Sequence, residues 1–206
     1  MKKVIAILIV MTVLTIGGNY KVSAEEKVVF KEILVKERVS IKPSIGVSYF
    51  LPNPQLTTGT GFCADLELGD YVFGIGLNSG NTNAKIMSIG TYTILPIYGL
   101  QKIRMSEIID ILVGGGYSIN SHEVDSRVIS YAESSGYTDL KEKLNGSVFL
   151  VVGAEIKTSQ NSKWILKYVL NKAKTDATAV KDGATLSNTM ESDLSGLMVN
   201  VNLELN

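Results

Sequence analysis

The sequence predicts an all-β fold, an eight-stranded antiparallel up-and-down transmembrane β-barrel. Three observations support it: segments that alternate between apolar and small or polar residues, connections that alternate between short and long, and an N-terminal secretion signal. No later segment approaches the ~20 apolar residues that a membrane-spanning helix needs. Any membrane crossing after the signal must therefore be made by strands.

The first 24 residues have the features of a signal peptide. Lys2 and Lys3 precede an apolar run, Val4 to Ile16, and Val22-Ser23-Ala24 supplies small residues at a cleavage site. An uncleaved anchor is the alternative, but the apolar run is shorter than a spanning helix. We expect a signal peptide over residues 1–24, a periplasmic lead over 25–43 that ends at Pro43, and a barrel over 44–206.

The clearest strand pair is the hairpin Gly61 to Asn78, which turns at Gly69-Asp70. One face is apolar and consists of Phe62, Ala64, Leu66, Leu68, Tyr71, Phe73, Ile75 and Leu77. The other face holds Gly61, Cys63, Asp65, Glu67, Val72, Gly74, Gly76 and Asn78. In a membrane barrel the first face would meet lipid and the second would line the lumen.

Six further segments alternate in the same way: Ser44–Leu51, Tyr92–Ile103, Ile108–Asn120, Val148–Thr158, Trp164–Asn171 and Leu194–Leu205. The longer links between strands all fall at one end: Pro52–Thr58, Ser79–Ala84, Ser121–Gly146 and Lys172–Asp193. We expect a short helix within Val128–Leu144 and otherwise mobile loops there. This end would face the cell exterior, and both termini would be periplasmic.

The strands Tyr92–Ile103 and Ile108–Asn120 are joined through Arg104–Glu107, which we interpret as an even-length loop. That length predicts an outer face on the first strand made of Tyr92, Ile94, Pro96, Tyr98 and Leu100. The second strand would present Ile109, Ile111, Val113, Gly115, Tyr117 and Ile119 on the same side. Leu95 and Ile97 would then point inward, opposite Gly116 and Gly114, as a narrow barrel interior requires.

Polar residues on inward positions are the candidate lumen residues: Asp65, Glu67, Asp110, Glu155, Lys167, Asn200, Asn202 and Glu204. Lys157 and Lys167 are the predicted counter-charges, and a five-residue turn after Thr158 would place Glu155 opposite Lys167. Paired charges that fill the lumen are the structural interpretation. A conducting path is the alternative, in which the excess of acids would favour cations.

Composition and isolated reactive residues exclude several functions. Removal of residues 1–24 leaves 17 basic and 20 acidic residues, so the formal charge is −3 and nothing suggests nucleic acid. The single cysteine, Cys63, allows no internal disulfide and is expected to pack in the interior. His122 is the only histidine and we expect it to be an exposed loop residue. We expect no catalytic, metal or cofactor site.

Three stretches together resemble one family. Ile94-Leu95-Pro96-Ile97-Tyr98 runs into a strand, Gly114-Gly115-Gly116-Tyr117 closes the next, and Gly153-Ala154-Glu155-Ile156 is followed by Lys163-Trp164. With these motifs, residues 44–205 resemble the OmpW-like group of small outer-membrane barrels. The resemblance implies a Gram-negative cell envelope, a narrow, largely apolar lumen and passage of small hydrophobic molecules. Its expected partners are outer-membrane lipid and the barrel-assembly and periplasmic chaperone machinery.

Three other functions remain open. The barrel would anchor long external loops in a structural or adhesive surface protein. An outer-membrane lipid hydrolase would use His122 as its base. A soluble barrel of the lipocalin type would place the apolar faces inside.

Overall fold

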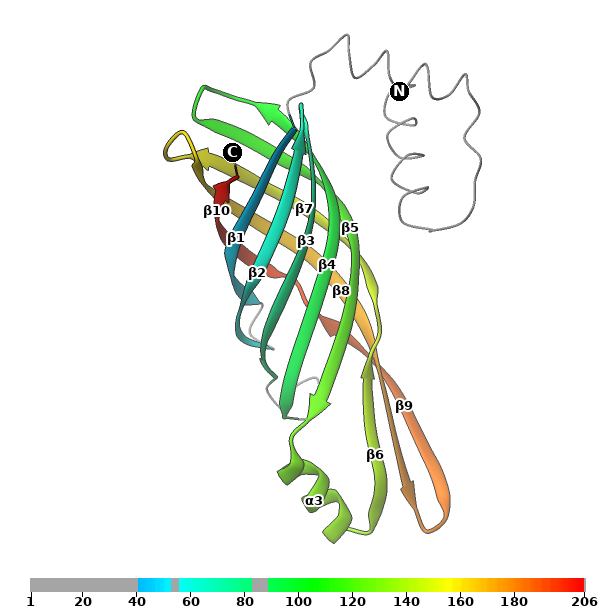
Figure 1. The fold of residues 1–206 in the computed structure, drawn as a ribbon. Helices are drawn as coiled ribbons and strands as arrows, with labels where there is room; N and C mark the ends of the chain where they lie inside the picture. The colour runs from blue at the N-terminus through cyan, green and yellow to red at the C-terminus, as the bar shows by residue number, and fades with distance from the viewer. Residues whose placement is uncertain (1–40, 53–55, 83–88, 206) are drawn as a thin grey trace, which may run out of the picture. The chain divides into compact units, whose positions relative to one another are not determined.

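A computed structural model describes residues 41–52, 56–82 and 89–205. Eight antiparallel strands form a closed barrel (Figure 1), which confirms the predicted fold class. In ring order they are β10 (Gly196–Glu204), β1 (Ile41–Pro52), β2 (Leu56–Leu68), β3 (Tyr71–Thr82), β4 (Gly90–Arg104), β5 (Ile109–Val124), β7 (Ser147–Lys157) and β8 (Ser162–Lys181). β8 pairs with β10 and completes the ring. No helix in the described part of the chain has the length and hydropathy needed to cross a membrane.

The start of the barrel differs slightly from the prediction. The predicted signal peptide and residues 25–40 of the predicted lead lie outside the described residues. β1 begins at Ile41, so Pro43 lies within the strand and pairs with Leu66. Proline has no N–H to donate, but its carbonyl still accepts a hydrogen bond, here from the Leu205 N–H at 2.8 Å.

The hairpin of β2 and β3 has the predicted register and faces. Leu68 pairs with Tyr71, Leu66 with Phe73 and Phe62 with Leu77. Gly69 adopts φ +60° in the turn, a left-handed conformation that glycine reaches without steric penalty. Phe62 and Leu77 are exposed, whereas Asp65 and Asn78 are buried inside the barrel.

The predicted register of β4 against β5 is wrong by three residues, because Leu95 pairs with Ile119 rather than with Gly116. Arg104 pairs with Asp110, so the connecting loop has an odd rather than an even number of residues. A slip by an odd number of residues exchanges the two faces of a strand. The residues that point inward are therefore Tyr92, Ile94, Pro96, Tyr98 and Leu100, while Leu95 and Ile97 lie on the outer face. Large side chains do face glycines as expected, but the pairs are Tyr98 with Gly116 and Leu100 with Gly114.

The turn between β7 and β8 is shifted along the chain. Lys157 pairs with Lys163, because the Thr158 and Ser159 N–H groups donate to the Ser162 carbonyl and close the turn there. Glu155 is consequently opposite Ile165 rather than Lys167, which pairs with Gly153. The shift preserves the inward direction of both charged side chains.

The two longest predicted loops contain regular structure. β8 continues past the barrel, where residues 172–181 pair with β9 (Ala184–Asp193) and residues 175–181 pair with β6 (Tyr137–Leu144). The helix α3 (Ser126–Ser134) precedes β6 and overlaps the start of the range in which a short helix was predicted. We call α3, β6, β9 and residues 172–181 the extension; Figure 1 shows it at the opposite end from the C-terminus. We call that end the long-connection end and the other the short-turn end.

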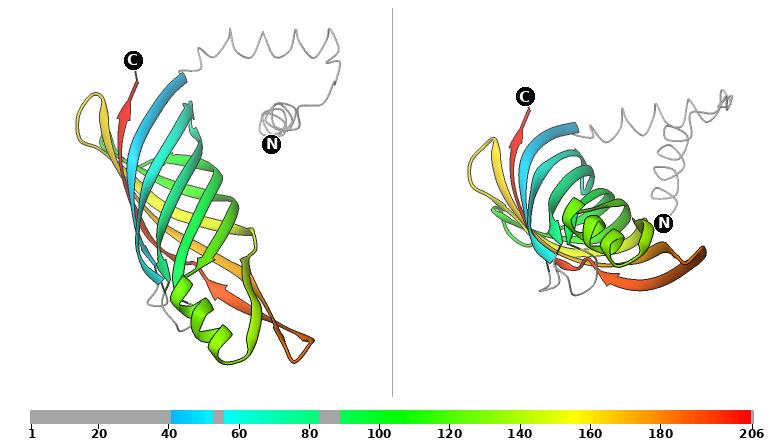
Figure 2. Two further views of the ribbon diagram at one scale, coloured as in Figure 1. Left: turned by 60° about the horizontal axis from the view of Figure 1, so that its bottom comes forward. Right: turned by 90° about the horizontal axis from the view of Figure 1, so that it is seen from below.

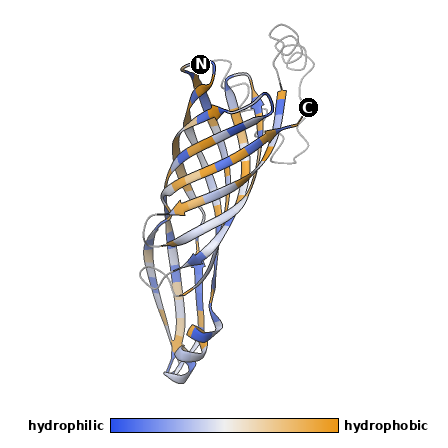
Figure 3. Ribbon diagram, turned by 90° about the vertical axis from the view of Figure 1, so that its left-hand side faces the viewer, coloured by the Kyte–Doolittle hydropathy of each residue, from blue (hydrophilic) through white to orange (hydrophobic). Residues whose placement is uncertain are grey.

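Hydropathy separates the two surfaces of the barrel. Hydrophobic and hydrophilic positions alternate along the barrel strands in Figure 3, as expected for a wall with two different faces. Exposed apolar residues occur all around the ring: Ile45, Val47, Phe62, Ile75, Leu77, Ile97, Val113, Ile119, Val148, Leu150, Val152, Leu170, Leu197 and Leu203. The right-hand view of Figure 2, from below, shows α3 in front of the barrel strands.

Candidate functional site

The interior of the barrel at the short-turn end is closed by two lysines and two glutamates. The Lys102 Nζ lies 2.9 Å from Glu67 Oε2 and 2.7 Å from Glu155 Oε1. The Lys163 Nζ lies 3.1 Å from the same Glu67 oxygen and 3.3 Å from Glu155 Oε2. These four residues, which we call the ionic square, come from β2, β4, β7 and β8. Because β2 and β7 are on opposite sides of the ring, the square crosses the lumen.

Two further acids lie at the edge of the ionic square. Asp110 Oδ2 is 3.3 Å from Lys157 Nζ and 3.6 Å from Lys102 Nζ. Glu204 Oε1 is 3.8 Å from Lys163 Nζ. Acids and lysines therefore occur together at this end of the barrel interior. Paired charges with little solvent access give the structural interpretation of a filled lumen.

On the side of the ionic square that faces the long-connection end, Asp65 is held by hydrogen bonds. It accepts from the Tyr98 hydroxyl at 2.5 Å and from Asn202 Nδ2 at 2.6 Å. Gly74, which pairs with Asp65 on β3, makes this contact possible, since a Cβ there would collide with the Tyr98 ring and the Asp65 carboxylate. A glycine is required at this position of the strand because the Asp65 carboxylate and the Tyr98 ring lie close to its backbone. The Cys63 thiol is buried beside Asn202, its acceptor at 3.3 Å.

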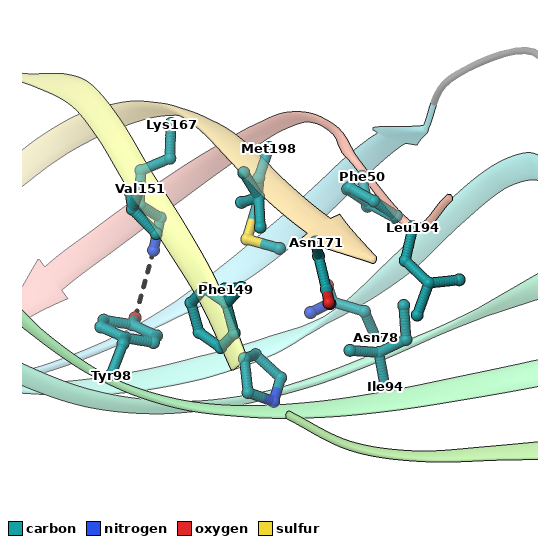
Figure 4. A pocket seen from close by; sticks show the side chains of 12 residues that line it. Phe50, Asn78, Ile94, Tyr98, Phe149, Val151, Lys167, Asn171, Leu194 and Met198 are labelled. Carbon is teal, nitrogen blue, oxygen red and sulfur yellow. Dashed lines mark hydrogen bonds between the residues drawn. The ribbon is translucent and has the colours of Figure 1, made fainter. Parts of the chain in front are cut away.

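An apolar chamber occupies the barrel interior between Asp65 and the long-connection end. It is lined by Phe50, Ile94, Pro96, Tyr98, Phe149, Val151, Val169, Leu194 and Met198, with Asn78, Lys167 and Asn171 as its polar members (Figure 4). The cavity volume is about 20 Å³, which is room for about one water molecule. In this conformation the side chains fill the chamber. The ionic square lies across the lumen between the chamber and the short-turn end.

Amide and hydroxyl groups surround the chamber toward the long-connection end. The Ser147 hydroxyl donates to Asn171 Oδ1 at 2.6 Å, and Asn120 Nδ2 donates to the Asn145 carbonyl at 2.8 Å. Asn171 Nδ2 donates to Ser118 Oγ at 3.3 Å. These residues carry no formal charge, so the chamber lies between a neutral polar layer and a charged one.

His122 is enclosed, which corrects the prediction of an exposed loop residue. β5 continues to Val124, so His122 belongs to the strand, and its side chain has no solvent exposure. Its Nδ1 lies 3.2 Å from Glu142 Oε2 on β6, and its Nε2 lies 3.2 Å from the Thr82 hydroxyl on β3. A hydroxyl, an imidazole and a carboxylate in this order have the composition of a nucleophilic triad. However, Thr82 is itself buried, and the three residues join β3, β5 and β6.

All eight predicted lumen residues point into the barrel. Asp65, Asp110, Glu155, Lys167, Asn200 and Asn202 are buried, and Glu67 and Glu204 are partly so. Lys102 and Lys163 were not predicted. The wrong β4 register put Lys102 on the outer face, and Lys163 was assigned to a turn. A loop with an odd number of residues between Arg104 and Asp110 would have predicted Lys102 to point inward.

Outside the barrel, Asp125 caps α3. Its carboxylate accepts from the Arg127 backbone N–H at 2.8 Å and from the Arg127 Nε at 2.9 Å. The Arg127 guanidinium and this backbone bond lower the pKa of Asp125 to about 2. The extension therefore begins with a helix whose first turn has a defined cap.

Comparisons with known proteins support the fold. No family model and no curated protein matches the sequence. The crystal structure of the outer membrane protein OprG from Pseudomonas aeruginosa aligns with a TM-score of 0.54 and 8% identity, over 82% of this chain and 97% of that one. A major outer membrane protein from Thermus thermophilus aligns with a TM-score of 0.51 and 11% identity, over 81% of this chain and 100% of that one.

The solution structure of the E. coli outer membrane protein W aligns with a TM-score of 0.49 and 12% identity, over 81% of this chain and 99% of that one. At these identities the likeness concerns the fold. The first two structures confirm the predicted fold, a small closed antiparallel β-barrel.

Proposed function

We propose that this chain is an integral outer-membrane protein whose barrel takes up small hydrophobic molecules from the long-connection end. The observation that carries the proposal is the apolar chamber inside the barrel, which the ionic square bounds on the side of the short-turn end. Its apolar walls suit an apolar guest, and the polar layers on either side set its limits along the barrel. Passage beyond the chamber would require the ionic square to open.

The exposed apolar residues support a membrane location. Phe62 is 69% exposed and Val148 73%, although each lies in the middle of a regular strand or at its start. Such surfaces are stable in lipid and aggregate in water. Alkaline carbonate should leave the protein in the membrane fraction, and unheated samples should migrate differently from boiled ones on a gel. Extraction by carbonate would instead support the soluble barrel.

The orientation is part of the proposal: the extension outside, and the first and last strand ends in the periplasm. In a Cys63→Ser background, Asn188→Cys on β9 and Asp70→Cys at a short turn place one thiol at each end. A membrane-impermeant maleimide added to intact cells should label the first and not the second. The reverse pattern would contradict the orientation.

Chamber function can be tested by filling it. Val151 points into the chamber and Val152, its neighbour on β7, points to the outer surface. Val151→Trp should abolish uptake of a small apolar fluorescent probe by cells that produce the protein, whereas the matched Val152→Trp should retain it. Equal uptake by both variants would argue against the conduit.

A second candidate, adhesion, is favoured by the extension. Ten residues of β8 continue beyond the barrel and pair with β6 and β9 to form a defined three-stranded sheet. Removing residues 175–190 and joining Lys174 to Glu191 through Asn-Gly would shorten the hairpin while leaving the barrel strands intact. Lost cell-surface binding with unchanged uptake would favour adhesion over the conduit. We propose no catalytic activity for either case.

A further inference from the structure

Lys167 places a single ammonium group in the floor of the apolar chamber. The residue is 2% exposed and comes from β8. Its Nζ donates to the Tyr98 hydroxyl at 3.2 Å and lies 4.3 Å from the centre of the Tyr98 ring (Figure 4). We propose that the chamber binds amphipathic molecules with a carboxylate head group, held by Lys167, and an apolar tail. This inference rests on the proposed function and names the ligand class of its chamber.

The local hydrogen bonds leave Lys167 able to bind an anion. An ammonium has three N–H donors, and within the described residues Lys167 uses one hydrogen bond, to Tyr98, and forms no direct ion pair. The nearest acid, Asp65, is occupied by Tyr98 and Asn202. The contrast with Lys102 and Lys163 is clear, since each of these contacts three carboxylates. A buried ammonium without a direct counter-ion is an unfavourable arrangement that an incoming anion improves.

Asn200 lies inside the barrel on the same strand as the chamber residue Met198, just outside the residues that line the chamber. It has no solvent exposure, and neither its Nδ2 nor its Oδ1 has a hydrogen-bond partner among the described residues. On β10 it follows Met198, which pairs with Lys167, by one inward position. Its other neighbour in the register is Ser48, which donates to the chamber residue Asn78 at 2.5 Å. An ammonium and an unpartnered amide N–H are both donors that a carboxylate accepts from.

The walls next to Lys167 are apolar, as an alkyl chain requires of its binding site. Phe149, Val169 and Met198 line this part of the chamber and carry no charge. The cavity of about 20 Å³ requires side chains to move before a ligand enters. Met198 is the side chain best able to do so, because methionine is unbranched and flexible. A neutral amphiphile would use the walls alone, and an amine would meet the like charge of Lys167.

The test compares three eight-carbon probes on the full barrel in nanodiscs of uncharged phosphatidylcholine. Octanoate, octan-1-ol and octylamine are titrated while the methyl NMR signal of Met198 is followed. We expect octanoate to shift this signal saturably and to bind at least about ten-fold more tightly than octanol, as hydrogen bonds to a buried charge predict. Octylamine should bind more weakly than octanol.

Variants separate the head group from the walls. Lys167→Met should reduce octanoate binding about ten-fold or more and abolish the preference for octanoate over octanol, whereas Lys167→Arg should retain that preference. Lys141→Gln, which removes an exposed lysine of β6, is the matched control and should bind like the wild type. If Lys167→Met fails to fold by gel migration, Asn200→Asp provides a second variant, since an acid beside Lys167 should displace octanoate but not octanol.

The titrations of the wild type and of Lys167→Met test the ligand class and the head-group site separately. Equal binding of octanoate and octanol to the wild type would overturn the carboxylate inference and leave the apolar chamber of the proposed function intact. No shift with any probe would contradict both. An octanoate preference that survives Lys167→Met would also overturn the assignment of the head-group site to Lys167.

Discussion

The two halves of the barrel interior are filled in opposite ways. At the short-turn end, Glu67, Lys102, Glu155 and Lys163 contact one another across the lumen at 2.7–3.3 Å. Toward the long-connection end, apolar side chains surround the chamber, and the one charged residue among its lining residues, Lys167, has no direct counter-ion in the described structure. The charged half connects distant strands through ion pairs, whereas the apolar half is packed by side chains that make few directional bonds.

This difference separates two roles of buried side chains. Charges withdrawn from water require partners in fixed positions, so a network of them is rigid and tolerates little change. Apolar side chains pack without directional bonds and tolerate replacement of similar volume. Stability should therefore depend most on the ionic square, and ligand binding most on the chamber.

The largest effect is expected from Lys102→Met. It leaves Glu67 and Glu155 with only Lys163 as a shared cation, and breaking a buried ion pair costs about 3–5 kcal/mol. Urea unfolding in lipid vesicles, followed by the fluorescence of Trp164, measures the loss. Lys157→Met is the control at the partly exposed edge and should cost less than about 1 kcal/mol. Equal losses would remove the distinction between a rigid and a tolerant half.

A smaller effect on stability is expected from Met198→Ala in the chamber. Truncation of a buried methionine costs about 2 kcal/mol at the low end of its range, which applies here because the site already adjoins a cavity. The enlarged chamber should also bind octan-1-ol more tightly, as titration would reveal. Weaker octanol binding would mean that Met198 is a specific contact and the chamber a fitted pocket.

A local effect is expected from His122→Ala, at the boundary between barrel and extension. Loss of its contacts to Glu142 and Thr82 should weaken the attachment of β6 by about 1 kcal/mol. Amide hydrogen exchange should accelerate in β6, while the unfolding of the barrel stays close to that of the wild type. We also expect neither the wild type nor the variant to hydrolyse lipid. Lipid hydrolysis that disappears in His122→Ala would instead establish the triad.

The smallest effect concerns Asp125, outside the barrel. Its pKa of about 2 in the folded protein lies below the ~3.9 of an unfolded chain. The ionised cap therefore stabilises α3 fully above about pH 4, and this contribution disappears as the pH falls toward 2. The NMR shift of the Arg127 amide should titrate with a midpoint near 2. A midpoint near 4, or an unchanged titration in Asp125→Asn, would contradict the capping bond.

Several features of the barrel could be predicted because they depend on neighbouring residues. Alternation assigned the faces of β2, β3, β5 and β10, and the two-residue turn at Gly69 fixed the register of β2 with β3. The inward direction of the eight predicted lumen residues followed from the same period of two. Since side chains alternate strictly along a strand, an assigned face extends along the whole element.

The extension was predicted only in part. Residues 172–177 alternate charged with small side chains, Ala173, Thr175 and Ala177 among the latter, but lack the large apolar residues that mark the barrel strands. They form a strand because β6 and β9 supply hydrogen-bond partners on both sides. Pairing with distant segments decides the structure where local preference is weak.

The sequence by itself determined the architecture, a barrel with an apolar outer surface, polar residues inside and its long connections at one end. The tertiary structure decided which interior charges meet. A loop of odd length turned Lys102 inward, and ring closure brought it together with Lys163, Glu67 and Glu155 from separate strands. It also left Lys167 without a direct carboxylate partner in the described residues, in the floor of the apolar chamber. Register and closure are properties of strand pairs and of the whole ring, so they decide contacts that the alternation along one strand cannot specify.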